Sequence, residues 1–203
     1  YNENESIFLK THSALCTLEN SSFTNKANTQ AVIYIVRDPR NVITSIANHY
    51  SLNIEESYNF MIDNNRMLVA DKWGGKNFGI GEMLGSWSQH YKSWQNIKFA
   101  PILNIKYENL INDTKNSLIT IINFLQRFIE VKVDNKKILK TVESCNFENL
   151  SKMEKKEGFD EAAYFKKTSK KVNFFHLGEK NNWKNLLNSE MEKKIRTAFD
   201  KEM

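Results

Sequence analysis

The sequence is poor in the residues that mark small secreted, metal-binding or fibrous proteins. Its 203 residues include two cysteines, Cys16 and Cys145, and neither stands in a CxxC or Cys/His metal spacing. A disulfide framework and a zinc site are therefore not indicated, and two lone thiols favour a reducing compartment. With two prolines and seven glycines, the composition also excludes collagen-like and low-complexity chains.

Long apolar runs are also lacking. No stretch approaches the roughly 18 consecutive apolar residues of a transmembrane helix, and the polar residues 1–5 do not resemble a secretory signal peptide. The sequence thus predicts a cytoplasmic protein without a membrane association. Because the chain opens on Tyr1 rather than on Met, we also expect an N-terminal part beyond this sequence.

The chain has only a small excess of positive charge. Lys and Arg number 29 and Asp and Glu 24, which gives a net charge of +5. This excess fits an anionic small ligand, although a dispersed solvated face is the commoner explanation, and no basic stripe with interleaved aromatics indicates nucleic acid binding. Apolar residues, in contrast, make up 40% of the chain, which at this length predicts a single domain over residues 1–203 with its own core.

A continuous β-branched and aromatic run over residues 31–36, AVIYIV, is typical of a strand covered on both faces. Similar runs predict parallel strands near 6–10 and 101–106. Further helices are expected over residues 55–69, 85–94, 118–125, 136–142 and 147–156, and from Ser189 onward, with a Ser189/Glu192 capping box and a buried face of Met191, Ile195, Ala198 and Phe199. This order predicts an α/β fold with a parallel sheet and helices on both faces.

Polar side chains follow the central strand at the point where it ends. Asp38 suits the N-cap and Pro39 the first position of a helix, so that Arg37 stands between a strand end and a helix N-terminus, where free N–H groups favour anions. Ser45 lies one turn beyond Asn41 on the same helical face and can join Arg37 around one oxyanion. The pattern predicts a phosphate site, although Arg37 could also pair with Asp38 and Ser45 could bond back to a helix carbonyl.

Three motifs resemble those of the sulfotransferases that use 3′-phosphoadenosine 5′-phosphosulfate (PAPS). The stretch from Ile33 to Ser45, IYIVRDPRNVITS, is similar to the family's 3′-phosphate motif, in which an Arg and a Ser eight residues later bind that phosphate. Residues 9–12, LKTH, resemble the segment that carries the catalytic base. Residues 107–110, YENL, resemble the strand end whose Tyr approaches the adenine, and residues 85–90, GSWSQH, resemble a helix of the family.

The resemblance implies a three-layer P-loop-kinase-like fold and transfer of a sulfuryl group from PAPS to a hydroxyl or amine of a small-molecule acceptor, with adenosine 3′,5′-bisphosphate (PAP) as the product. It implies His12 as the base, Lys10 as a cation beside the transferring group, Arg37 and Ser45 at the 3′-phosphate, and Tyr107 beside the adenine. It calls for no metal and no nucleic acid, and it is compatible with a homodimer. The acceptor pocket is expected along loops near 74–81 and 152–171.

The carboxyl-terminal part matches the family more loosely. Residues 174–184 resemble a segment that begins Arg-Lys-Gly and ends Gly-Asp-Trp-Lys, and Gly178 and Trp183 match it. His176 and Leu177 replace the Arg and Lys. Cys145 stands where many members have a Thr that touches the base. The resemblance therefore adds Cys145, His176 and Gly178 to the candidate nucleotide contacts.

Two alternative functions follow from family motifs that this sequence does not match. The family's 5′-phosphosulfate loop is not found ahead of Lys10, which leaves open a nucleotide-binding remnant or regulatory module that holds PAP without turnover. A small-molecule kinase on the same scaffold is a further alternative, but neither a Walker-type loop nor a pair of Mg²⁺ ligands is visible. His49 and His90 are interpreted as structural.

Overall fold

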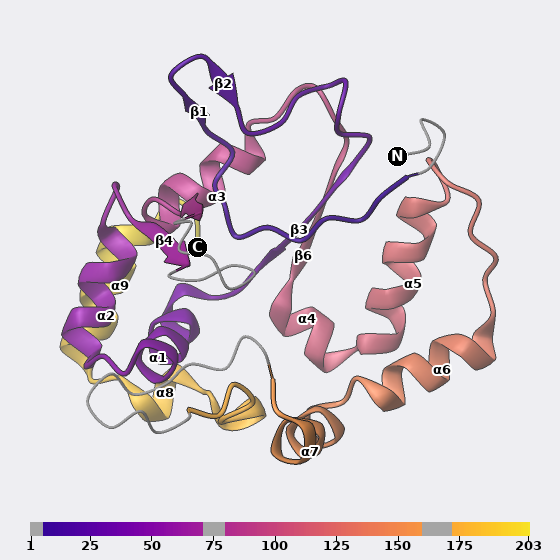
Figure 1. Cartoon of the computed structure of the whole chain (residues 1–203). Helices are drawn as coiled ribbons and strands as arrows, with labels where there is room; N and C mark the ends of the chain where they lie inside the picture. Colours follow the sequence, from indigo (N-terminus) through magenta and orange to yellow (C-terminus); the bar gives the residue numbers. More distant parts are fainter. Residues whose placement is uncertain (1–5, 71–79, 160–171) are drawn as a thin grey trace.

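Two parallel strands, β3 (Val32–Val36) and β6 (Ile102–Lys106), run through the middle of the molecule (Figure 1). They pair in register from Val32 opposite Ile102 to Val36 opposite Lys106. The computed structural model describes residues 6–70, 80–159 and 172–203. Both strands were predicted, and each is confirmed to within one residue.

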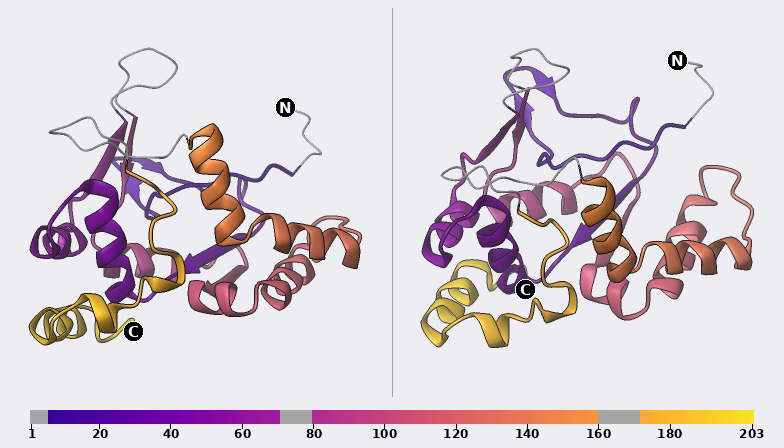
Figure 2. Two further views of the ribbon diagram at one scale, coloured as in Figure 1. Left: turned by 90° about the horizontal axis from the view of Figure 1, so that it is seen from below. Right: turned by 60° about the horizontal axis from the view of Figure 1, so that its bottom comes forward.

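Helices lie on both sides of this strand pair. Helix α3 (Trp87–Gln95) packs on the face that carries Tyr34 and Asn104, because His90 and Gln95 hydrogen-bond to these two side chains. Helix α5 (Thr114–Leu125) contacts β6 from another side. Figure 2 shows α5 and α6 (Asn135–Ser144) on one side of β3 and β6, with α1 (Pro39–Tyr50), α2 (Ile54–Ile62), α8 (Trp183–Leu186) and α9 (Ser189–Phe199) on the other. The α/β class with a parallel sheet and helices is therefore confirmed.

Helix α1 (Pro39–Tyr50) begins as its sequence predicts. The carboxylate of Asp38 accepts a hydrogen bond from the backbone N–H of Arg40, and Pro39 takes the first helical position. Helix α2 (Ile54–Ile62) has a capping box made by Asn53 and Glu56. The helix predicted over 55–69 is wrong in its second half, because a turn after Asp63 redirects the chain into β4 (Met67–Ala70), which pairs with β5 (Ile80–Met83) in antiparallel fashion.

A core cluster joins α1, α2 and α9 (Ser189–Phe199). On α9, Met191, Ile195 and Phe199 are buried as predicted, whereas Ala198 is exposed. The predicted capping box is also wrong. The N-cap is Asn188, whose side-chain oxygen accepts from the N–H of Met191, and Ser189 is already the first helical residue. An Asn is at least as good an N-cap as a Ser, so the helix begins one residue earlier than expected.

The strand predicted near 6–10 does not form. Residues 6–14 have no strand, and the apolar run of Ile7, Phe8 and Leu9 is 56%, 68% and 88% exposed. A strand needs a row of backbone partners, and the next residues find theirs elsewhere: the N–H of His12 bonds to the Glu82 carboxylate and that of Ala14 to the carbonyl of Met83. The apolar run of residues 7–9 predicts a strand from its composition, but it cannot show with which segment the backbone will pair.

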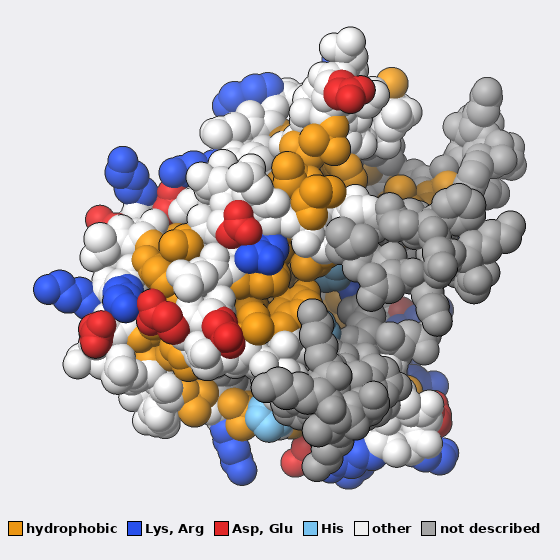
Figure 3. Space-filling view, turned by 60° about the vertical axis from the view of Figure 1, so that its left-hand side comes forward, with side chains coloured by type: hydrophobic (Ala, Val, Ile, Leu, Met, Phe, Trp, Pro, Cys, Tyr) orange, Lys and Arg blue, Asp and Glu red, His pale blue; other side chains and the backbone are white. Residues whose placement is uncertain are grey.

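The remaining elements complete the chain. They are β1 (Thr17–Leu18), β2 (Ser21–Ser22), α4 (Tyr107–Asn112), α6 (Asn135–Ser144), α7 (Phe147–Glu157), the 3₁₀ turn η1 (Gly178–Lys180) and α8 (Trp183–Leu186). The expected acceptor loops fall largely outside the described residues, since 71–79 and 160–171 are not among them. No helix in the described ranges has the length and apolar character needed to cross a membrane. On the face drawn in Figure 3, Lys and Arg side chains are dispersed among Asp and Glu.

Candidate functional site

Arg37 and Tyr107 lie side by side at the carboxyl ends of the two parallel strands. Each is the next residue after the last pair of the ladder, Val36 opposite Lys106. The Arg37 guanidinium carbon stands 4.4 Å from the centre of the Tyr107 ring, a distance typical of a cation–π contact. The strand register thus brings together a cation and an aromatic face that are far apart in the sequence.

Ser45 joins the same cluster from α1. Its Oγ accepts a hydrogen bond from a terminal N–H of Arg37 at 3.2 Å, so the two side chains of the predicted phosphate motif are in contact. The Ser45 hydroxyl also donates to the carbonyl of Asn41, at 3.2 Å. This back-bond is the ordinary structural interpretation of Ser45, and it coexists with the contact to Arg37.

Asn181 is a member of the cluster that sequence reasoning missed. Its side-chain N–H₂ donates to Ser45 Oγ at 2.9 Å and to the carbonyl of Asn41 at 3.2 Å. Its side-chain oxygen accepts from the buried hydroxyl of Thr44. In the aligned segment of the family a Gly stands at this position. That departure was a signal in the sequence, but nothing local indicated that the side chain would point toward Ser45.

The backbone N–H groups at the start of α1 are already used. Arg40 N–H is capped by the Asp38 carboxylate, and the N–H of Asp38 itself donates to Glu108 at 3.1 Å. The N–H groups of Asn41 and Val42 bond to the carbonyl of Asp38. The expectation that free helical N–H groups would hold an anion is therefore wrong here, and any anion would depend on side chains.

The Arg37 side chain offers a donor that could bind an anion. Its Nε is buried and has no hydrogen-bond partner among the described residues. A buried, charged donor without a partner is costly, and an anionic acceptor would satisfy it. A phosphate group would meet this requirement, with Arg37 as the cation and with Ser45 and Asn181 beside it.

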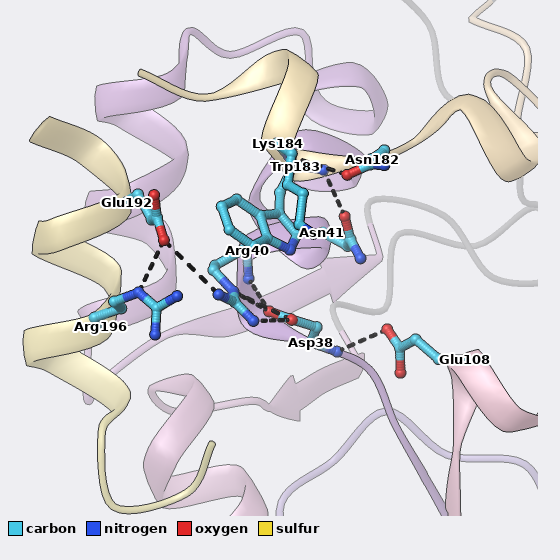
Figure 4. A network of polar contacts seen from close by, with 9 residues as sticks. All are labelled: Asp38, Arg40, Asn41, Glu108, Asn182, Trp183, Lys184, Glu192 and Arg196. Atoms are coloured by element: carbon cyan, nitrogen blue, oxygen red, sulfur yellow. Dashed lines mark hydrogen bonds and ion pairs between the residues drawn. The ribbon is translucent and has the colours of Figure 1, made fainter. Parts of the chain in front are cut away.

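A polar network fixes the start of α1 against the carboxyl-terminal elements (Figure 4). Arg40 binds Asp38 with a shortest distance of 2.6 Å, and its guanidinium carbon lies 4.0 Å from the centre of the Trp183 ring. The backbone N–H of Trp183 donates to the side-chain oxygen of Asn41, at 2.9 Å. Glu192 of α9 lies 3.9 Å from Arg40. These contacts place the segment that contains Asn181 over α1.

Gly178 has a structural reason to be glycine. Its φ is +55°, and a Cβ there would lie 2.9 Å from three ring atoms of Phe147. Upstream, the buried carboxylate of Glu154 accepts from the N–H groups of Phe174 and Phe175. Helix α7 thus anchors the chain that leads to Asn181.

The other predicted nucleotide contacts stand apart from Arg37. Both Cys145 and His176 are exposed, and within the described residues no hydrogen bond joins either side chain to Arg37 or Ser45. Cys145 is the C-cap of α6, and the N–H of His176 donates to the carbonyl of Phe174. Their expected roles at the nucleotide remain predictions.

Lys10 and His12 are exposed and belong to the irregular segment beside α3. The N–H of His12 donates to a Glu82 carboxylate oxygen at 3.2 Å, and its carbonyl lies 3.1 Å from Nε2 of His90. His90 Nδ1 in turn lies 2.9 Å from the Tyr34 hydroxyl. Tyr34 and Arg37 are three residues apart near the end of β3, about 10 Å at the usual strand rise, so the two groups of candidate residues border the same strand.

These observations define an α/β protein in which Arg37, Ser45, Tyr107 and Asn181 form a cluster at the carboxyl end of the central parallel strands. The family model described as the sulfotransferase domain matches residues 1–203. The chain therefore belongs to the sulfotransferase family.

Individual relatives agree with this assignment. The chain is 32% identical to Sulfotransferase 1A1 of Rattus norvegicus over 134 residues, 63% of this chain and 40% of that protein. It is 25% identical to Sulfotransferase 1B1 of Canis lupus familiaris over 199 residues, 96% of this chain and 61% of that protein. The chain thus spans about half the length of the curated relatives it matches.

A solved structure shares the fold. The crystal structure of mouse sulfotransferase SULT7A1 complexed with PAP aligns with a TM-score of 0.57 and 20% identity, covering 86% of this chain and 58% of that one. At this identity the likeness supports the fold.

Proposed function

We propose that this chain belongs to an enzyme that transfers a sulfuryl group from PAPS to a hydroxyl or amine of a small-molecule acceptor. The observation that carries the proposal is the buried Nε of Arg37, which lies beside Ser45 and Tyr107 and has no hydrogen-bond partner in the part of the chain that the structure describes. The family membership and the solved relative complexed with PAP favour an adenosine bisphosphate as the anion.

Each residue has a definite task in this proposal. Arg37 and Ser45 bind the 3′-phosphate and Tyr107 flanks the adenine, so that binding energy is supplied far from the reacting atoms. PAPS, when bound, supplies the sulfuryl group. The His12 imidazole takes the proton of the acceptor hydroxyl or amine, and the Lys10 ammonium offsets negative charge on the transferring group.

The acceptor class rests on the names of relatives. The chain is 23% identical over 187 residues to a protein named amine sulfotransferase from Oryctolagus cuniculus, covering 88% of this chain and 56% of that protein. Amines and alcohols both offer a proton and a lone pair to the same chemistry, so we include both. A homodimer stays a prediction.

Calorimetry with PAP, and with ATP as the control, tests the nucleotide half of the proposal. We expect PAP to bind and ATP to bind more weakly, whereas ATP binding without PAP binding would refute it and favour a kinase. Labelled PAPS with a panel of phenols, alcohols and amines tests the transfer half. PAP binding without transfer to any acceptor would favour a non-catalytic nucleotide-binding protein.

A further inference from the structure

Helix α3 holds the backbone of the segment that carries His12. The carbonyl of His12 meets His90 Nε2 at 3.1 Å, the carbonyl of Ser13 accepts from Trp94 Nε1 at 3.0 Å, and the N–H of Leu15 donates to Ser93 Oγ at 3.0 Å. His90, Ser93 and Trp94 are spaced by three and four residues, so they share one face of α3. These three hydrogen bonds explain why residues 12–15 are ordered without forming a strand.

The contacts of His90 determine which of its ring nitrogens carries the proton. A backbone carbonyl can only accept, so Nε2, which faces the His12 carbonyl, must be the donor. In a neutral ring Nδ1 is then an acceptor, and the Tyr34 hydroxyl 2.9 Å away must donate to it. The His12 carbonyl therefore fixes the tautomer of His90, and the Tyr34 hydroxyl, which can donate or accept, bonds to the remaining ring nitrogen.

Burial keeps both rings in these states. It lowers the pKa of the His90 imidazole and raises the pKa of the Tyr34 phenol, because each charged form would lose its hydration. The Tyr34 ring also packs against Tyr91 of α3, with ring centres 6.0 Å apart. The central strand, α3 and the His12 segment are thus linked through one neutral imidazole.

We propose that His90 is a positioning residue that holds the backbone of His12, and so its imidazole, in place for proton transfer, with the Tyr34 hydroxyl bonded to the other ring nitrogen of His90. This inference rests on the proposed function, in which His12 is the general base. His90 does not touch the reacting atoms. It acts by limiting the positions that the His12 ring can reach, and a misplacement of about 1 Å can cost about 100-fold in rate.

Two variants each keep one of the two hydrogen bonds of His90. In His90→Gln, the amide nitrogen occupies the place of Nε2 and can still donate to the His12 carbonyl. In His90→Asn, the shorter side chain can accept from Tyr34 but does not reach His12. Because the two variants lose the same number of bonds, they form a matched pair that separates positioning from stability.

We expect His90→Gln to stay within about threefold of the wild-type kcat and His90→Asn to fall by about 10- to 100-fold. The affinity for PAP by calorimetry should be unchanged in both, since Arg37 and Ser45 are untouched. Equal losses of kcat in the two variants, or a loss of PAP affinity that accounts for the loss of activity, would mean that His90 is only structural.

A second measurement does not depend on turnover. Nitrogen-15 NMR of the histidine rings in the wild-type chain should place the His90 proton on Nε2 between pH 6 and 8, and Tyr34→Phe, which removes the donor to Nδ1 but leaves the His12 carbonyl, should keep the proton on Nε2. Hydrogen exchange at residues 12–15 should be faster in His90→Asn than in His90→Gln. A proton on Nδ1 in the wild type, or equal exchange in the two variants, overturns the inference. If no transfer is seen even in the wild type, the proposed function fails, and these two measurements still decide whether His90 holds the His12 segment.

Discussion

At the scale of the residue, the Arg37 guanidinium makes two contacts, a hydrogen bond to Ser45 and a stack on Tyr107, and its buried Nε has no partner among the described residues. Lysine would keep the charge but lose the planar fork and the Nε–H. We expect Arg37→Lys to weaken PAP binding by about 10- to 100-fold, the value of a charged hydrogen bond, and to affect adenosine 5′-monophosphate much less.

Calorimetry with both nucleotides isolates the 3′-phosphate, because that phosphate is the difference between them. Arg127→Lys is the control, since Arg127 also stacks on aromatic rings, those of Phe124 and Phe128, but in the turn that follows α5. An unchanged ratio of the two affinities in Arg37→Lys would contradict the assignment of Arg37 to the 3′-phosphate.

Asn181 gives a second test of the same site. In Asn181→Ala the donor to Ser45 is lost, and we expect PAP binding to weaken by only a few-fold. In Asn181→Asp a carboxylate would stand beside the oxygen that Arg37 already contacts, where it would pair with Arg37 and repel a phosphate. Calorimetry should therefore show a much larger loss of PAP affinity for Asp than for Ala, with thermal unfolding as the control for stability. Equal losses would place the anion away from Asn181.

The sequence could predict the contact between Arg37 and Ser45, because both residues lie on one strand–helix unit whose geometry is local. It could not predict Asn181, which reaches Ser45 only because Arg40, Asn41 and Trp183 fix the chain end against α1. The sequence also could not show the contacts of His90, because the partners of its two ring nitrogens, Tyr34 and the His12 carbonyl, come from two distant segments.

At the scale of the element, helices were predicted well wherever the signal was a local cap or a strong apolar stripe, as in α1 and α5. The strand near 6–10 was wrong because strands depend on distant partners. Dependence on a distant partner also explains why β4, which pairs with β5, was not predicted, and why a helix was expected to continue to residue 69. The cap of α9 was wrong by one residue, since Asn188 and Ser189 are both suitable N-caps and only the fold decides between them.

The link between α3 and the His12 segment predicts a pH dependence of stability. Burial lowers the pKa of His90 in the folded state, so the unfolded chain binds the proton more readily. The stabilisation from neutral His90 is fully present above pH of about 6.5, the ordinary histidine value, and is lost as the pH falls toward the folded-state pKa.

The comparison of thermal unfolding for wild type and His90→Gln between pH 5 and 8 measures this effect. The titratable groups nearest the ring are Tyr34, Tyr91, His12 and Glu82, and they are the same in both proteins. We expect the advantage of the wild type to shrink below pH 6.5. An advantage that stays constant or grows toward pH 5 would show that His90 is not held neutral.

At the scale of the whole molecule, burial is uneven. Ile43, Met61, Met191, Ile195 and Phe199 form one cluster where α1, α2 and α9 meet. Among the described residues of α5 and α6, the buried apolar side chains are Phe124 and Ile138. Because local stability follows buried apolar contacts, α1 and α9 should open less often than α6. The Arg37–Ser45 cluster lies on the better-packed side.

The same substitution at two buried isoleucines tests this division. Ile195 on α9 is 0% exposed and Ile138 on α6 is 3% exposed, so Ile195→Ala and Ile138→Ala each remove a buried side chain of the same size. Ile195→Ala should lower the free energy of unfolding by about 2–5 kcal/mol. It should also speed hydrogen exchange throughout α1, because α9 packs against α1, the helix that carries Ser45.

The control variant Ile138→Ala should act mainly on exchange within α6 and α5 and leave α1 protected. If Ile138→Ala exposed α1 to exchange as strongly as Ile195→Ala, the two sides would unfold as one unit, and the support of the Arg37–Ser45 cluster could not be assigned to α9.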